Sequence, residues 1–132
     1  MMSDNPQDCS FSLIRVTLPM LDSALEVLRM QADGEASAVD IVQRALDQIE
    51  ASQPTHNAYT HVDRELAIAA AEAVDQKRAS GKTLGPLAGV PVAVKDVLCT
   101  RDMPTTCSSE MLRDFRPPYD ATVVEKLRAA DA

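Results

Sequence analysis

Hydrophobic positions in the first 80 residues recur every three or four residues, the spacing at which side chains share one face of an α-helix. Residues 1–19 carry no such pattern, and we expect them to form a disordered leader. The stripes that follow are Leu21, Leu25, Leu28 and Ala32; Val42, Leu46 and Ile49; and Leu66, Ala69, Ala70, Ala73 and Val74. They predict three amphipathic helices.

Capping residues set the predicted ends of these helices. Ser37, followed three residues later by Asp40, is a near-match to the capping box and marks the start of the second helix. Asp63 can cap the third helix in the same way. Gly34 and Gly81 are suitable C-terminal stops, because glycine adopts the left-handed backbone that ends many helices.

Two segments favour β-strands instead. Residues 57–62, beyond the helix end that Pro54 marks, alternate weakly between polar and apolar side chains. After the turn-rich residues 85–91, the apolar run Val92-Ala93-Val94 does not alternate. Such a β-branched run indicates a strand buried on both faces, and a proline is tolerated at its start.

The last third of the chain predicts a long loop and a final helix. Residues 99–119 lack a periodic pattern, apart from one possible helical turn near residues 109–112. Asp120 or Thr122 can cap the final helix, and Thr122 with Glu125 is a second capping-box match. The apolar positions of this helix are Val123, Val124 and Leu127. No stop signal follows the helix before residue 132.

These elements predict an α/β fold that is incomplete in this chain, since three or four helices and one or two strands do not close a sheet. Apolar residues make up 45% of the sequence, but many are alanine, and aromatic residues make up only 3%. The core is therefore thin for 132 residues. We expect residues 20–132 to be the N-terminal part of one domain, truncated at its C-terminus.

The charge balance argues against direct binding of nucleic acid. The formal net charge is −7, and no run of Lys and Arg is longer than Lys77-Arg78. Because binding to a phosphate backbone normally starts from a basic patch, this chain is not expected to hold tRNA or DNA by itself.

The three cysteines, Cys9, Cys99 and Cys107, fit free thiols in a reducing cytoplasm. The N-terminus lacks the basic start and apolar stretch of a secretory signal, and no apolar run could span a bilayer. Cys107 with His56 or His61 could form a thiol hydrolase pair, and His56 with His61, five residues apart, could contribute to a zinc site that lacks a third ligand nearby. Neither is expected, because no spacing brings these residues together.

Lys95 is the candidate catalytic residue. It interrupts the apolar strand near its C-terminal end, where ligands bind in parallel α/β sheets. A lysine among Val92, Val94 and Val97 would lose hydration, which favours the neutral amine, and a neutral lysine can act as a general base. The alternative is that the strand surfaces here and Lys95-Asp96 is merely solvated.

The segment around Lys95 resembles the signature of the amidase-signature family. The similar residues are Leu87-Ala88-Gly89-Val90-Pro91-Val92-Ala93-Val94-Lys95-Asp96, and the likeness continues through residues 105–109, 111–112 and 117–127. Within that family the longer match is closest to the A subunits of glutamyl-tRNA(Gln) amidotransferases. The resemblance implies an α/β fold in which N-terminal helices lie beside the first core strands of a mixed sheet flanked by helices.

The resemblance also implies a catalytic lysine and two serines. In that family the lysine accepts a proton, through a bridging serine, from the nucleophilic serine. Only the lysine maps onto this chain, at Lys95, and the serines would lie beyond residue 132. Ser108-Ser109 is not followed by glycines and is wrongly spaced from Lys95, so we expect a loop or a helix cap there.

For the complete enzyme, the resemblance implies hydrolysis of glutamine to supply ammonia. The partner B and C subunits would use ATP and magnesium to convert Glu-tRNA(Gln) to Gln-tRNA(Gln), and the B subunit would hold the tRNA. This chain alone is expected to be inactive, with no cofactor of its own. The alternatives are another amidase-signature hydrolase and a non-catalytic remnant that only binds a partner. The family usually shows glycine where this chain has Asp131, which leaves the exit from the last helix open.

Overall fold

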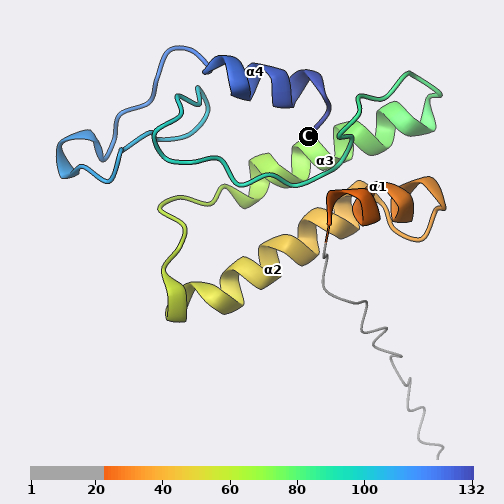
Figure 1. The fold of residues 1–132 in the computed structure, drawn as a ribbon, viewed down its shortest axis with the longest axis horizontal. Helices are drawn as coiled ribbons and strands as arrows, with labels where there is room; N and C mark the ends of the chain where they lie inside the picture. The colour runs from red at the N-terminus through yellow and green to blue at the C-terminus, as the bar shows by residue number, and fades with distance from the viewer. Residues whose placement is uncertain (1–22) are drawn as a thin grey trace, which may run out of the picture.

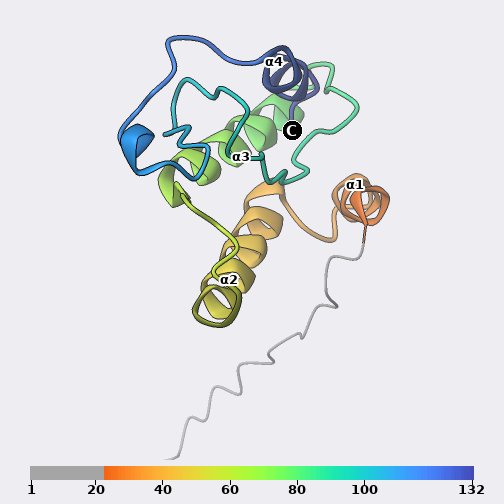
Figure 2. The same cartoon turned by 60° about the vertical axis from the view of Figure 1, so that its left-hand side comes forward.

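The computed structural model describes residues 23–132, so the leader expected over residues 1–19 lies outside the described residues. The elements are α1 (Ala24–Ala32), α2 (Ala38–His56), α3 (Arg64–Ala79), the 3-10 helix η1 (Glu110–Leu112) and α4 (Thr122–Ala129). The two long helices α2 and α3 pack against each other, and α1 lies beside the start of α2 (Figure 1). In both ribbon views α3 lies between α2 and α4 (Figure 2).

Two clusters of small and aliphatic side chains form the core. The cluster between α2 and α3 comprises Ala38, Val42, Leu46, Ala71, Val74 and Ala88. The cluster between α1 and α2 comprises Val27, Met30, Ala36, Ile41 and Val90. The segment after α3 contributes to both clusters through Ala88 and Val90, so its path is fixed by packing as far as Val90.

The apolar face predicted for α1 is wrong at Leu25, which is 78% exposed. The buried residues of α1 are Val27, Met30 and Gln31. Gln31 is buried because its side-chain amide donates to the Ala88 carbonyl at 3.0 Å. The two residues lie 57 positions apart in the sequence. Their contact, and not the spacing of the leucines, sets which face of α1 is buried. Leu21 lies outside the described residues.

The start of α2 is confirmed and its predicted end is wrong. The Asp40 N–H donates to Ser37 Oγ, and the Ser37 N–H donates to the Asp40 carboxylate, each at 3.0 Å. The helix runs past Pro54 to His56 and ends at Asn57, whose φ of 45° is left-handed. Pro54 lies in the last turn, where its missing N–H removes a single helical hydrogen bond.

The ends of α3 are confirmed, but its buried face is partly different. Asp63 accepts the Leu66 N–H at 2.9 Å, and Gly81 follows the helix with φ 68°. Ala71 and Val74 are the buried residues of the helix, whereas the predicted stripe members Ala69 and Ala73 are exposed. The buried face packs on α2, whereas the predicted stripe member Ala70 is exposed and lines an open groove together with Leu66.

The predicted strands are not formed in residues 23–132. Residues 57–62 and 92–94 are irregular, and Val92 is 45% exposed. A strand needs neighbouring strands to pair its N–H and C=O groups, and this part of the chain supplies none. The helices of the expected α/β fold are therefore present in the described residues, but its mixed sheet is not.

The long loop and its helical turn at η1 are confirmed, and the cap predicted for α4 is wrong. The N-cap residue of α4 is Ala121, and no side chain caps this end. The Asp120 carboxylate instead accepts the Arg101 N–H at 2.8 Å and pairs with Arg128 at 3.2 Å. The Asp120 carboxylate is thus engaged by Arg101 of the loop and Arg128 of α4 and does not cap the helix, whose first residue is Thr122.

Candidate active site

The segment that leads to Lys95 begins in a turn bound to the C-terminal end of α4. The Leu87 N–H donates to the Ala130 carbonyl at 3.0 Å, and the Gly89 N–H donates to the Asp131 carbonyl at 2.8 Å. The Gly85 N–H donates to the Asp131 carboxylate. Residues far apart in the sequence thus fix the start of the segment.

Two glycines allow this close approach. A Cβ on Gly85 would collide with the backbone carbonyl group of Ala130. A Cβ on Gly89 would lie 2.5 Å from Gln31 Oε1, and Gly89 also has a left-handed φ of 71°. A larger residue at either position would push the turn away from its anchors.

Lys95 lies at an exposed position on this segment, between the half-buried Val94 and Asp96. Its backbone is held, because the Leu98 N–H donates to the Lys95 carbonyl at 2.9 Å. Within residues 23–132 its ammonium group makes no hydrogen bond or ion pair. The candidate base therefore has a fixed backbone and a side chain that is free to reach a reacting group.

Asp96 joins the Lys95 segment to the turn at residues 105–109. The Thr106 N–H and hydroxyl donate to the Asp96 carboxylate at 2.7 and 2.5 Å. The hydrogen bond from the Thr106 hydroxyl is the main cause that lowers the pKa of Asp96 below its ordinary value. Sequence reasoning quoted Asp96 in the motif but gave it no role, because its partner lies ten residues away.

Ser108 and Ser109 take the structural positions expected for them. Ser108 is exposed in the turn that Asp96 holds, with a left-handed φ of 56°. Ser109 is the N-cap residue of η1, although its side chain makes no capping hydrogen bond. Neither serine makes a side-chain hydrogen bond to Lys95, so the described residues contain no lysine–serine pair.

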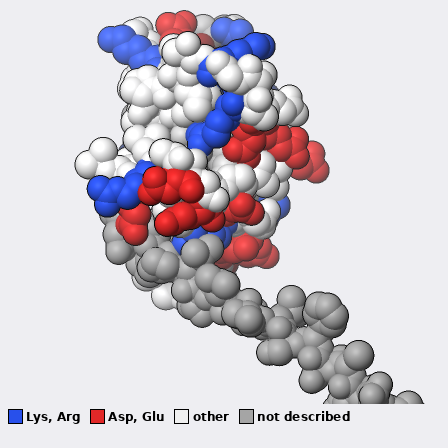
Figure 3. Space-filling view, turned by 90° about the vertical axis from the view of Figure 1, so that its right-hand side faces the viewer, with Lys and Arg blue, Asp and Glu red and all other residues white. Residues whose placement is uncertain are grey.

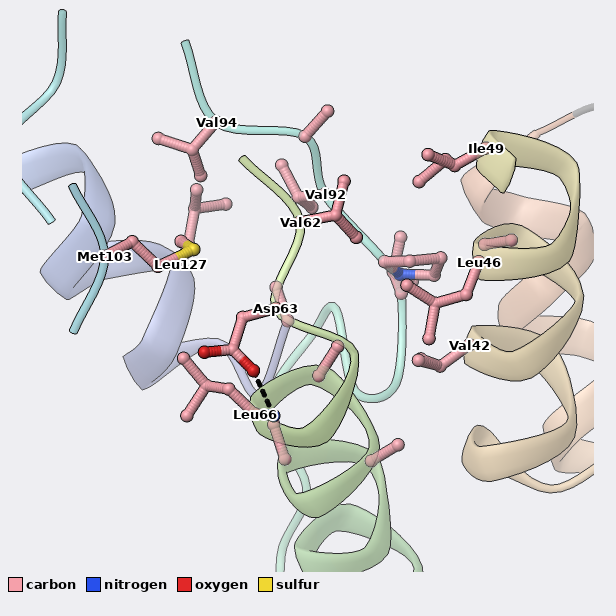
Figure 4. A pocket seen from close by; sticks show the side chains of 18 of the residues that line it. Val42, Leu46, Ile49, Val62, Asp63, Leu66, Val92, Val94, Met103 and Leu127 are labelled. Atoms are coloured by element: carbon pink, nitrogen blue, oxygen red, sulfur yellow. Dashed lines mark hydrogen bonds between the residues drawn. The ribbon is translucent and has the colours of Figure 1, made fainter. Parts of the chain in front are cut away.

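An apolar groove of about 640 Å³ opens beside the Lys95 segment. Figure 4 shows Val92 and Val94 above this groove, with Leu46 and Ile49 from α2, Leu66 from the start of α3 and Leu127 from α4 around it. Lys95 is not among the residues that line the groove. Its walls are mostly apolar, with a few charged residues such as Asp63 and Arg128.

The other candidate groups do not assemble into a site. Cys107 is exposed, and Cys99 Sγ lies 3.5 Å from the Tyr119 hydroxyl and not beside a histidine. Among residues 23–132, no group of three or more His, Cys, Asp or Glu side chains is placed to hold a metal ion. None of the described helices is both long and apolar enough to cross a membrane.

Curated relatives with similar sequences are named as A subunits of glutamyl-tRNA(Gln) amidotransferase. The protein from Rhodopirellula baltica is 63% identical over 113 residues, which is 86% of this chain and 23% of that protein. The protein from Streptomyces avermitilis is 46% identical over 124 residues, 94% of this chain and 24% of that protein. This chain therefore spans about a quarter of the length of these relatives.

Solved structures with the same arrangement include an amidase. It is described as "Crystal structure of amidase" and is 31% identical, with a TM-score of 0.73 over 83% of this chain and 25% of the amidase chain. A structure described as a vestigial protein complex that reveals the origins of an s-triazine catabolic enzyme is 37% identical, with a TM-score of 0.78 over 83% of this chain and 24% of its own. The sequence model of the Amidase family matches residues 40–132, and this chain therefore belongs to the amidase family.

Proposed function

We propose that this chain is the N-terminal part of the A subunit of a glutamyl-tRNA(Gln) amidotransferase, and that it supplies the catalytic lysine, Lys95. The observation that carries this proposal is the 63% identity to such an A subunit over 113 residues. The family match over residues 40–132 includes Lys95 and the anchored segment around it. The proposed activity of the complete protein is hydrolysis of the glutamine side-chain amide to release ammonia.

In this proposal Lys95 acts as the general base. Its neutral amine accepts the proton that the nucleophilic serine loses, and the proton passes through a bridging serine. Both serines would come from parts of the protein outside this chain. Lys95 makes no ion pair within residues 23–132, which supports the proposal, because an ion pair would favour the protonated ammonium. Its side chain is exposed in these residues, so in this proposal the loss of hydration that favours the neutral amine comes from parts of the protein outside this chain.

The proposed partners are the amidotransferase B and C subunits, in a heterotrimer that works in the cytoplasm. ATP and magnesium would serve the conversion of Glu-tRNA(Gln) to Gln-tRNA(Gln). We propose that the nucleotide, the metal and the tRNA bind the partner subunits. The net charge of −7 supports this for the tRNA, since an acidic chain repels a phosphate backbone.

A second candidate is an amide hydrolase that works without tRNA. The similarity to the structure described as an amidase supports this candidate. A segment that carries a catalytic lysine would be needed in either enzyme. The identity to that structure is 31%, against 46% and 63% for the A subunits above, which favours the amidotransferase.

A hybrid A subunit tests the proposal. Residues of this chain replace the aligned 113-residue segment of the Rhodopirellula baltica protein, and the hybrid is assembled with that organism's B and C subunits. We expect glutamine-dependent formation of Gln-tRNA(Gln) from Glu-tRNA(Gln), measured with ATP and magnesium present. A hybrid that hydrolyses simple amides but not glutamine would support the second candidate. A folded hybrid that hydrolyses neither would contradict both.

A further inference from the structure

Asp96 follows Lys95 directly and holds a turn ten residues further along the chain. The Thr106 N–H and hydroxyl donate to its two carboxylate oxygens, and the Cys107 N–H donates to its carbonyl at 2.9 Å. The Ser108 N–H lies 3.5 Å from the same carboxylate and donates more closely, at 3.1 Å, to Thr106 Oγ1. The side chain and the backbone of Asp96 thus bind the same turn.

This turn has a conformation that needs to be held. Cys107 and Ser108 have φ values of 50° and 56°, two successive left-handed residues that are not glycine. Such conformations persist only where the surroundings enforce them. The hydrogen bonds to Asp96 supply that enforcement, so the turn and the Asp96 peptide form one rigid unit.

Lys95 is attached to this unit on its C-terminal side. Its carbonyl accepts the Leu98 N–H, so the backbone closes a short turn around Asp96. On the N-terminal side, Val92 and the residues that follow it up to Lys95 are irregular, and Val92 is exposed. Asp96 is therefore the nearest residue that ties the Lys95 backbone to another part of the fold.

We propose that Asp96 is a positioning residue for Lys95. By holding the turn at residues 105–109, it fixes the backbone from which the lysine amine reaches the reacting serine. This inference rests on the proposed function, because it needs Lys95 to be the base. Asp96 itself exchanges no proton in this role, which agrees with the lowered pKa that the Thr106 hydroxyl gives it.

The test compares three substitutions in the hybrid A subunit with its partners. Asp96→Asn removes one acceptor oxygen, Thr106→Val removes the donor hydroxyl, and Thr106→Ser keeps it. We expect Asp96→Asn and Thr106→Val to lower kcat for ammonia release from glutamine by on the order of tenfold to a hundredfold, since a misplaced catalytic group costs about this much. KM for glutamine should change by less than about twofold, and Thr106→Ser should retain kcat.

Asp102→Asn is the matched control. Asp102 belongs to the same long loop and pairs with Arg128 at 2.7 Å, but within residues 23–132 its side chain makes no hydrogen bond to the Lys95 segment. A normal kcat in both Asp96→Asn and Thr106→Val would overturn the inference. The inference would also be overturned if Asp102→Asn lowered kcat as much as Asp96→Asn does while the thermal midpoints of the two variants fell equally. The role of Asp96 would then be only structural.

Failure of the proposed function would look different. A hybrid that keeps its glutaminase activity in Lys95→Ala, or a folded hybrid without that activity, would contradict the function. In either case, hydrogen exchange at the amides of residues 106–108 tests whether Asp96 holds the turn. Faster exchange in Asp96→Asn supports the anchoring of the turn, and unchanged exchange overturns it.

Discussion

At the scale of single residues, Asp131 takes a backbone conformation that favours glycine. Its φ of 61° is left-handed, a conformation that aspartate tolerates better than most residues. Its carboxylate lies 2.6 Å from Lys77 Nζ and accepts the Gly85 N–H. The side chain therefore joins α3, the end of α4 and the turn that leads to Lys95.

We predict that Asp131→Ala destabilises the hybrid A subunit more than Asp131→Gly does. Alanine loses both the charged hydrogen bonds and the tolerance of the left-handed backbone, whereas glycine loses only the bonds. Charged hydrogen bonds of this kind contribute about 1–3 kcal/mol. Denaturant unfolding measures the change, with the exposed Asp114 replaced by Ala as the control. An Asp131→Gly variant destabilised as much as Asp131→Ala would contradict this prediction, because the left-handed backbone would then make no difference.

The Asp131 contacts also give a pH dependence. The bond from Lys77, and then the bond from the Gly85 N–H, lower the pKa of Asp131 in the folded state. A lowered folded pKa gives stability that is complete above the unfolded pKa of about 3.9 and is lost as pH falls through the folded value. The difference in thermal midpoint between the parent and Asp131→Asn should therefore stay constant from about pH 7 to pH 5 and shrink in more acidic buffers. A difference that grows as the pH falls would contradict this assignment.

At the scale of elements, the start of α2 is capped from two sides. The capping box of Ser37 and Asp40 is local, and the Asp75 carboxylate from α3 accepts the Ala38 and Val39 N–H groups at 2.9 and 3.1 Å. Ala38 is fully buried, so water cannot replace Asp75 there. The tertiary contact thus satisfies donors that the local cap leaves free.

We predict that Asp75→Ala costs more stability than Ser37→Ala. Loss of the Ser37 cap should cost about 1 kcal/mol, the usual value for an N-cap serine. Asp75→Ala strands a buried N–H group, which costs about 1–3 kcal/mol for each unsatisfied donor. Urea unfolding of the two hybrid variants gives the comparison. Equal losses would contradict the prediction that the Asp75 contact contributes more than the local cap.

The helices also show which features of the fold could be predicted from the sequence. The caps at Ser37, Asp63 and Gly81 are correct because each is made by residues within a few positions of one another. The rotation of α1 and the strand at Val92 are wrong because each depends on distant partners. At the candidate site, the motif indicated Lys95, whereas the contact of Asp96 with Thr106 leaves no pattern in the sequence.

At the scale of the whole molecule, the apolar groove predicts that this chain folds poorly alone. The groove opens between α2, α3 and α4, and Val92, which lines it, is 45% exposed. Val97, further along the same segment, is 56% exposed. Open apolar surface of this extent favours association. We expect the isolated 132-residue chain to unfold without a cooperative thermal transition. A sharp transition, with slow hydrogen exchange from Val92 to Val97 on a confirmed monomer, would contradict this.

The charge distribution predicts that the isolated chain does not bind tRNA. The net charge is −7, and on the face in Figure 3 basic and acidic side chains are interspersed, without a continuous basic stripe. Few counterions would be released on contact with a phosphate backbone. Titration of labelled tRNA at low salt should show no saturable binding in the micromolar range. Tight binding with a steep salt dependence would overturn the assignment of tRNA to the partner subunits.

The most direct test of the central claim is ammonia release from glutamine by the hybrid A subunit with Lys95 replaced. Loss of a general base lowers the rate by about a hundredfold to ten-thousandfold. We predict losses of this size in Lys95→Ala and also in Lys95→Arg, because arginine keeps its proton at all accessible pH values. Ser108→Ala and Ser109→Ala should remain close to the parent. Near-normal turnover in Lys95→Arg, or a folded but inactive Ser109→Ala, would contradict the role of Lys95 as the neutral base.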